Sequence, residues 1–127
     1  MTDVLDPTTR EFWAAAAAGL LVVQRCARCG YHQLYPRPFC LGCDSGDLSW
    51  IEASGQGTVY SCVTVHLPVR PDIPPPYGVG LVDLDEGPRV LAHVPQDAAI
   101  GERLVASWSP PRQEGERPLL VFRREAP

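Results

Sequence analysis

Residues 26–43 read CARCGYHQLYPRPFCLGC and contain two Cys-x-x-Cys pairs with ten residues between them. Two residues between cysteines let the chain turn so that both sulfurs face one point, and two such pairs complete a tetrahedral sulfur site. The spacing predicts a zinc ribbon in which Cys26, Cys29, Cys40 and Cys43 hold one structural zinc ion. Because all four ligands are cysteines, no coordination position stays open for a catalytic water.

Iron in the same site would make it an electron-transfer centre, and Cys-x-x-Cys-Gly-Tyr at residues 26–31 does resemble a rubredoxin knuckle. Rubredoxin has a much longer interval between its knuckles, however, and its second knuckle normally reads Cys-Pro-x-Cys-Gly. The sequence therefore favours zinc. The fifth cysteine, Cys62, lies inside a predicted strand and is interpreted as a small buried hydrophobic residue. His66 is roughly 13 Å away along that strand, too far for a direct catalytic pair.

The composition narrows the classes of protein to consider. The chain has 127 residues, which suits one domain or one domain with a small appended module, and its formal net charge is −4. All eleven basic residues are arginines, and the negative balance argues against a protein that mainly neutralises nucleic-acid phosphates. No apolar run is long enough to span a membrane, and the start lacks a signal sequence, so we expect a cytoplasmic protein.

One short helix is predicted before the ribbon, over residues 9–19. Thr8 and Glu11 have capping-box spacing, and Gly19 is a favourable C-terminal stop. Phe12 and Trp13 give this helix an apolar face. A helix of this length is marginal alone, so it needs a surface to pack on. Either the core of the same chain or a partner protein could supply that surface.

After the ribbon the apolar pattern changes to period two, which predicts short β-strands. The expected strands cover residues 58–66, 77–84, 89–94, 104–108 and 119–123, with a stiff proline-rich loop at 68–76. In the first strand, Val59, Val63 and Val65 are expected to share one face. About five strands separated by turns favour a small closed barrel over an open sheet with unprotected edges. The expected boundaries are a helical segment at 1–22, a zinc ribbon at 23–50 and a barrel at 51–127.

The charged and nucleophilic residues form no self-sufficient catalytic constellation. The three histidines are scattered, and no Ser-His-Asp set, phosphate loop or paired acid cluster is present. Arg25, Arg28 and Arg37 lie in a stretch without acidic residues between Phe12 and Cys43. These arginines either balance the thiolate charge or attract the phosphates of a ligand.

The order of these motifs resembles that of the DUF35 family, proteins with a zinc ribbon and an OB fold that associate with acyl-CoA enzymes. The resemblance covers residues 12–123 and rests on the Phe-Trp helix, on VVQRCARCG and YPRPFCLGC, and on GTVYS and LVDLDEGPRVL. It implies a mainly β fold, with a short N-terminal helix, a rubredoxin-like zinc ribbon and then an OB-fold β-barrel. It also implies a partner from the thiolase superfamily, whose members include acetyl-transferring thiolases and aldolases that shorten steroid side chains.

The expected function is therefore that of a non-catalytic accessory subunit in a thiolase or steroid side-chain aldolase complex, one chain per partner subunit. Phe12 and Trp13 are the candidate partner contacts. Arg28, Arg37, Arg70 and His66 are candidate contacts to an acyl-CoA shared with the partner. Two other classes are weighed against this one: an OB-fold protein that binds single-stranded nucleic acid, and a free-standing enzyme, for which no catalytic set is visible.

Overall fold

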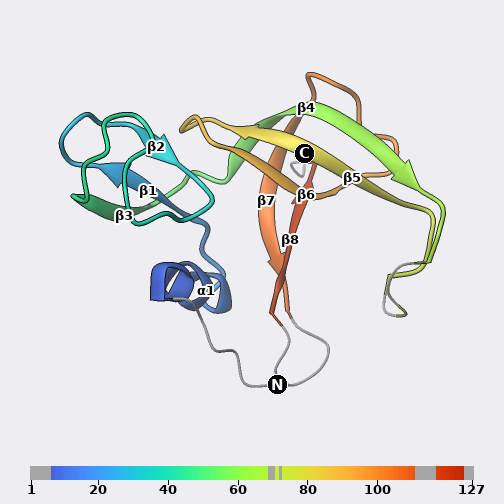
Figure 1. Cartoon of the computed structure of the whole chain (residues 1–127). Helices are drawn as coiled ribbons and strands as arrows, with labels where there is room; N and C mark the ends of the chain where they lie inside the picture. Colours follow the sequence, from blue (N-terminus) through green and yellow to red (C-terminus); the bar gives the residue numbers. More distant parts are fainter. Residues whose placement is uncertain (1–6, 69–70, 72, 111–116, 125–127) are drawn as a thin grey trace.

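A computed structural model describes residues 7–68, 71, 73–110 and 117–124. It shows a short helix, a small three-stranded sheet and a five-stranded barrel in chain order (Figure 1). This confirms the predicted fold class, mainly β with one short helix, a zinc ribbon and an OB-type barrel. In the described part of the chain, no helix is long and apolar enough to cross a membrane.

The helix α1, Arg10–Ala17, follows a 3-10 turn, Pro7–Thr9. Because the turn takes up Thr8, the N-cap is Thr9, one residue later than the predicted capping box, and its side chain makes no capping hydrogen bond. The helix ends where Gly19 adopts a φ of 84°, and the Leu20 N–H donates to the Ala15 carbonyl at 2.8 Å. A positive φ is readily adopted by glycine, so Gly19 turns the chain into the first strand.

The ribbon sheet consists of β1, Val22–Cys26, β2, His32–Gln33, and β3, Leu48–Glu52. β1 is the central strand and pairs antiparallel with both neighbours. β2 has only two residues, too few for a periodic pattern, and it was not expected from the sequence. β3 runs across the predicted boundary between residues 50 and 51 and continues directly towards the barrel.

The barrel closes in the order β4-β5-β6-β8-β7, with β7 paired back to β4. β6 and β8 run parallel, whereas the other pairs are antiparallel. Closure removes the exposed strand edges that an open sheet of this size would present. The strands are β4, Gln56–Val65, β5, Tyr77–Leu84, β6, Arg89–Val94, β7, Arg103–Ser109, and β8, Leu119–Arg123.

A β-bulge in β4 overturns one detail of the sequence analysis. Val59 pairs with Val82 and Ser61 pairs with Leu81, so Tyr60 is the extra residue. An extra residue reverses which side chains face inward beyond it. Val59 is 2% exposed in the core, but Val63 is 64% exposed, and Cys62 packs against the core instead. The prediction that Val59 and Val63 share a face is therefore wrong.

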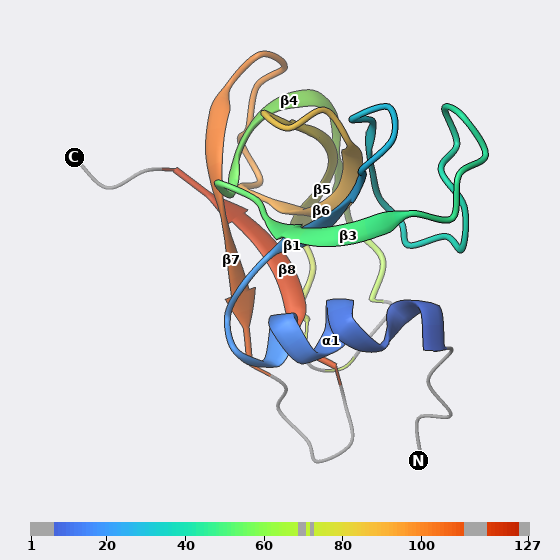
Figure 2. The ribbon, with the colours of Figure 1, turned by 90° about the vertical axis from the view of Figure 1, so that its left-hand side faces the viewer.

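An aromatic cluster joins the three parts of the molecule. Phe12 of α1 packs against Trp50 of β3 and Trp108 of β7, with ring centroids 6.4 and 5.9 Å away. The Trp108 indole N–H also donates to the Leu20 carbonyl at 3.0 Å. Figure 2 shows α1 lying across one end of the molecule, next to both the ribbon sheet and the barrel. Phe12 is 5% exposed and so fills the core of its own chain, one of the two alternatives that the sequence left open.

Candidate metal centre and partner surface

The four ribbon cysteines converge on one point. All four Sγ atoms lie within 4.8 Å of one another, with 3.6 Å between those of Cys26 and Cys43 and 3.5 Å between those of Cys29 and Cys40. A tetrahedral zinc with Zn–S bonds of about 2.3 Å needs sulfurs about 3.8 Å apart, close to the spacing of these two pairs. The donor set and its geometry therefore fit one structural zinc ion.

The two Cys-x-x-Cys turns have the same backbone design. In each, an N–H just beyond the second cysteine donates to the carbonyl of the first: Gly30 to Cys26 and Asp44 to Cys40, both at 2.9 Å. The donating residue has a positive φ in both turns, 79° at Gly30 and 66° at Asp44. Aspartate is one of the few non-glycine residues that tolerates this region. The second turn therefore uses Asp44 as the first uses Gly30.

Backbone N–H groups also support the thiolates. Cys29 N–H points at the Cys26 Sγ at 3.5 Å, and Gly42 N–H points at the Cys40 Sγ at 3.2 Å. The backbone N–H of Cys29 is the main cause that lowers the pKa of the Cys26 thiol to about 6. The thiolate is the form that binds metal. At Cys29 and Cys43 the backbone hydrogen bonds are outweighed by burial and by the neighbouring sulfurs, which raise the pKa of both thiols, so among these three cysteines the fold favours the thiolate only at Cys26.

An apolar pocket of about 430 Å³ lies where α1, the ribbon and the barrel meet. Its walls come from α1, from Leu34 and Tyr35 of the ribbon, from Ile73 of the proline-rich loop, and from strands β5 to β8. Tyr77 and His93 pack against each other at its wall, with ring centroids 5.5 Å apart and the rings tilted by 45°. The pocket can hold an apolar group. Its described lining contains no carboxylate or thiol beside the histidine, so it offers no acid, base and nucleophile set.

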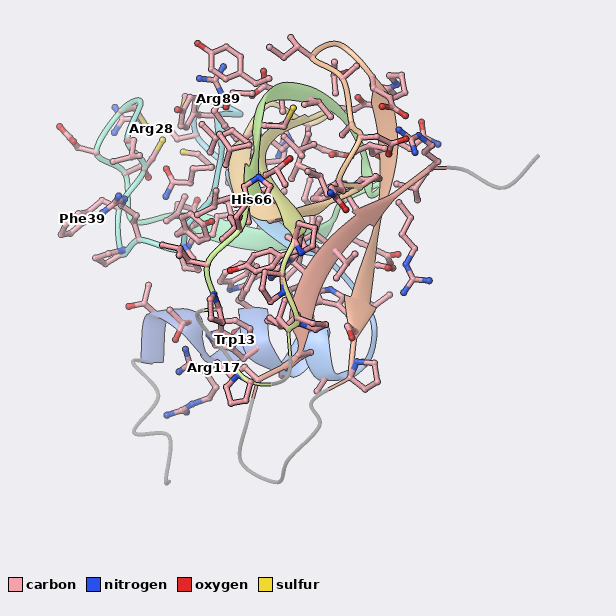
Figure 3. The ribbon with its side chains drawn as sticks, turned by 90° about the vertical axis from the view of Figure 1, so that its right-hand side faces the viewer. Trp13, Arg28, Phe39, His66, Arg89 and Arg117 are labelled. Atoms are coloured by element: carbon pink, nitrogen blue, oxygen red, sulfur yellow. The ribbon has the colours of Figure 1, made fainter. Side chains whose placement is uncertain are left out.

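The candidate partner residues lie at the edge of this pocket. Trp13 is half-buried, lines the pocket and stacks under the Arg117 guanidinium at 4.6 Å, as Figure 3 shows. Phe12 also lines the pocket but is almost fully buried. Of the two residues, Trp13 is therefore the one whose surface a partner could reach directly.

The candidate acyl-CoA contacts do not form one cluster in the described structure. Arg28 and Arg37 are exposed on the ribbon, whereas His66 is exposed just beyond β4 on the barrel. Figure 3 shows Arg28 and His66 on these two parts of the molecule. Arg70 lies outside the described residues. No hydrogen bond or ion pair joins Arg28, Arg37 and His66 within the described part of the chain. Their role as acyl-CoA contacts stays a prediction.

Sequence reasoning missed a second group of surface residues. Tyr35, Phe39 and Leu41 are large apolar side chains in the metal-binding segment, and each is at least half exposed: 50%, 61% and 61%. The signal for them was present in the sequence, because a loop that only carries zinc ligands does not need three large apolar residues. The pocket could not have been found, since its walls come from segments far apart in the chain.

Two domain families match the chain in succession. The family model for the rubredoxin-like zinc ribbon domain of ChsH2 matches residues 13–49, and the one for the C-terminal OB-fold domain of ChsH2 matches residues 50–109. Together they cover well over half of the chain.

Among solved structures, the chain resembles a chain of the Ltp2-ChsH2(DUF35) aldolase, with a TM-score of 0.82 and 35% identity. The match covers 97% of this chain and 98% of that one. A DUF35 protein of unknown function from Sulfolobus solfataricus gives a TM-score of 0.65 over 97% of this chain and 89% of its own length. At 13% identity, that second likeness shows the fold alone.

Among curated proteins, the chain is 39% identical to the probable enoyl-CoA hydratase alpha subunit of Thermomonospora curvata, over 91% of its own length. It is 34% identical to the 3-oxo-4,17-pregnadiene-20-carboxyl-CoA hydratase alpha subunit of Mycobacterium tuberculosis, over 79% of its length. The chain spans only 37% and 33% of these two relatives.

A third relative has nearly the same length as this chain. It is the DUF35 domain-containing scaffold protein of Methanothermobacter thermautotrophicus, which is 31% identical over 80% of this chain and 81% of the relative. The order of ribbon and barrel, the four convergent cysteines and the matches along the chain agree with one another. The chain therefore belongs to the DUF35 family, with a rubredoxin-like ribbon that holds one structural zinc ion and an OB-fold barrel.

Proposed function

We propose that this chain is a non-catalytic accessory subunit that binds and supports a thiolase-like enzyme acting on acyl-CoA thioesters. The observation that carries the proposal is the end-to-end likeness to a chain of the Ltp2-ChsH2(DUF35) aldolase, over 97% of one chain and 98% of the other. The scaffold name of the archaeal relative of similar length supports the same role. More specifically, we propose that the partner enzyme is an aldolase or a thiolase.

A hydratase activity has weaker support. The two hydratase alpha subunits are about three times as long as the matched segment, since the chain spans 37% and 33% of them. Their named activity belongs to whole proteins of which this chain matches only about a third. The similarity is better explained by a shared accessory module than by a shared active site.

The described side chains support a non-catalytic role. The zinc site has four cysteine ligands and so no position for a reactive water. The Cys62 thiol donates to the Ala98 carbonyl at 3.3 Å and has no base beside it in the described structure. His66 is exposed and lies on a different part of the molecule from the ribbon arginines. We therefore assign the catalytic residues to the partner.

We further propose that the acyl-CoA is shared between the two subunits. The apolar pocket of about 430 Å³ borders the proline-rich loop and the barrel, where an extended pantetheine arm or acyl group would find an apolar wall. Arg28, Arg37, Arg70 and His66 would then be candidates to meet the CoA phosphates. Replacing exposed Leu91 in the pocket wall with Trp should raise the KM of the complex for acyl-CoA without changing complex formation.

The main experiment combines the purified chain with purified Ltp2, the other component named in the aldolase. We expect a stable complex with one accessory chain per Ltp2 subunit, measured by light scattering after size-exclusion chromatography. The isolated chain should turn over no acyl-CoA and should not shift single-stranded DNA or RNA in a gel. Turnover by the chain alone, or tight nucleic-acid binding without complex formation, would refute the proposal.

A further inference from the structure

The segment between β2 and the second cysteine pair, residues 34–41, is called the ribbon loop below. Two buried glutamines lie behind it: Gln24 on β1 is 5% exposed and Gln33 on β2 is 3% exposed. They are direct cross-strand neighbours, and the Gln33 Nε2 donates to the Gln24 Oε1 at 2.9 Å. Buried amides are costly unless their hydrogen bonds are made, so the remaining partners of this pair matter.

All remaining partners of the glutamine pair are backbone groups of the ribbon loop. Gln24 accepts from the Arg37 N–H and donates to the Arg37 carbonyl, both at 2.9 Å. Gln33 donates to the Phe39 carbonyl at 3.0 Å and accepts from the Leu41 N–H at 2.9 Å. Alternate residues of the loop are thus held from the inside, which fixes its backbone in one conformation.

The side chains of the same three residues point outward. Phe39 and Leu41 are each 61% exposed, and Arg37 is exposed as well. Figure 3 shows Phe39 projecting from the ribbon away from the barrel. Holding Cys40 in the metal site requires the backbone of this loop, but it does not require large apolar side chains in solvent. The exposed side chains therefore need a second explanation.

The charge around the loop indicates what it meets. Arg28 and Arg37 make no ion pair with any described residue, and no acidic residue occurs between Phe12 and Cys43. The chain as a whole is negative, at −4, whereas the three arginines of this stretch outweigh the net negative charge of four thiolates around one zinc ion and leave a small positive excess there. A fixed loop with an exposed aromatic residue also loses little conformational entropy when it docks.

From these observations we infer that the ribbon loop is a docking site for an apolar patch with acidic residues at its rim, on the surface of a partner protein. Phe39 and Leu41 fill the apolar patch, and Arg37 meets the acidic rim. Gln24 and Gln33 are positioning residues, because they hold the backbone and do not touch the partner. This inference rests on the proposed function, since the protein carrying the patch is the thiolase-like enzyme.

The test compares two double variants in titrations with purified Ltp2. Phe39→Ala with Leu41→Ala removes the docking side chains, and Leu67→Ala with Ile100→Ala removes two barrel residues that are equally exposed, at 74% and 73%. We expect the Kd of the ribbon-loop variant to rise about tenfold or more. The Kd of the barrel variant should stay within about twofold of the original. Zinc content and melting temperature are measured for each protein.

A second variant keeps the test decisive if the double variant loses its fold. Arg37→Glu leaves the backbone bonds to Gln24 available, so its ribbon should keep its zinc. We expect slower association with Ltp2 and a reversed dependence on salt, because attraction to the acidic rim becomes repulsion. The matched control, Arg123→Glu, replaces an exposed arginine of β8. It should change neither the rate of association with Ltp2 nor the salt dependence of that rate.

The possible outcomes distinguish failure of the docking inference from failure of the proposed accessory function. If the original chain does not bind Ltp2, the aldolase form of the proposed function fails and the docking inference, as stated for that partner, fails with it. Should the original chain bind while the ribbon-loop variants bind equally well, the docking inference is wrong and the proposed function stands. A ribbon loop that serves CoA instead would show CoA binding lost in Arg37→Glu, with Ltp2 binding unchanged, and this result would also overturn the inference.

Discussion

Cys40 and Cys62 are both largely enclosed by protein, yet only Cys40 belongs to the metal site. Cys40 lies 1% exposed at the start of the second knuckle, where the backbone N–H of Gly42 donates to its sulfur. Cys62 lies on a barrel strand, and its thiol donates a hydrogen bond to the Ala98 carbonyl. The sequence already distinguished these two roles, because Cys40 belongs to a Cys-x-x-Cys pair and Cys62 does not. The positive φ of Asp44 was not predictable, because aspartate adopts that region only where the surrounding turn demands it.

Replacing Cys40 with Ser should reduce zinc content from one ion per chain to nearly none. The ribbon should unfold with it, because binding of a structural zinc is coupled to folding. Elemental analysis and circular dichroism measure the two effects. Cys62→Ser is the matched control and should retain the full zinc content. Full zinc occupancy in the Cys40 variant would contradict the assignment of the site.

The bulge at Tyr60 leads to a second prediction, on two valines of one strand. Val59→Ala should lower the free energy of unfolding by roughly 2 kcal/mol, because it opens space in the barrel core. Val63→Ala should change it by less than about 0.5 kcal/mol, since that side chain is already in solvent. Urea unfolding of both variants measures the difference. Equal losses of unfolding free energy would mean that Val63 also faces the core, so that the bulge does not change which side chains point inward.

Most strands of the barrel could be predicted because each has enough alternating residues to show its period. β5, β6 and β8 begin and end where the sequence indicated. β2 is too short to show a period, and the bulge leaves no local signal. The close approach of neighbouring barrel strands also could not be predicted from the sequence. A Cβ on Gly78 would lie 2.5 Å from the Val94 carbonyl oxygen, so β5 approaches β6 in a way that only glycine permits.

Among the contacts between elements, Arg124 links the end of β8 to the connection between β6 and β7. It forms ion pairs with Asp97 and Glu102 and lowers the pKa of both carboxyl groups. Their folded-state pKa values therefore lie below those in the unfolded chain, about 4. The contribution of these pairs to stability is complete above that value and is lost as pH falls through the lowered folded values.

We therefore expect Arg124→Gln to be less stable than the original chain at pH 7, with the difference shrinking as pH falls below about 4 and the two carboxyl groups become protonated. The effect should be small, because Arg124 is about half exposed and Asp97 is mostly in solvent. Urea midpoints at pH 7 and at pH values below about 4 measure it. Arg123→Gln controls for loss of a positive charge and for any zinc release in acid. A difference that persists unchanged at low pH would exclude these carboxylates as its source.

In the whole molecule, the helix, ribbon and barrel meet at Phe12. The sequence predicted each of the three parts but not the contact between them, because packing between Phe12, Trp50 and Trp108 joins residues far apart in the chain. Sequence reasoning therefore left two alternatives for the helix. Phe12 is buried in the core of its own chain, whereas docking of a partner by Trp13 stays a proposal.

Phe12→Ala should consequently cost about 3–5 kcal/mol of unfolding free energy, the usual range for a buried phenylalanine. Zinc content should not change, because the metal site is formed within residues 26–43. Trp13→Ala, which removes a half-buried side chain, should cost less. Thermal unfolding with zinc analysis measures both. A Phe12 variant as stable as the original would mean that α1 is not part of the core.

The aromatic cluster also gives the chain a built-in optical probe. The sequence contains three tryptophans, and Trp13, Trp50 and Trp108 all pack against the Phe12 ring. Intrinsic fluorescence therefore reports on one location, the junction of helix, ribbon and barrel, and not on the molecule as a whole. Trp13 and Trp108 also line the apolar pocket. A group that enters the pocket should alter the emission spectrum without any label, while one that binds only Phe39 and Leu41 of the ribbon loop should leave it unchanged.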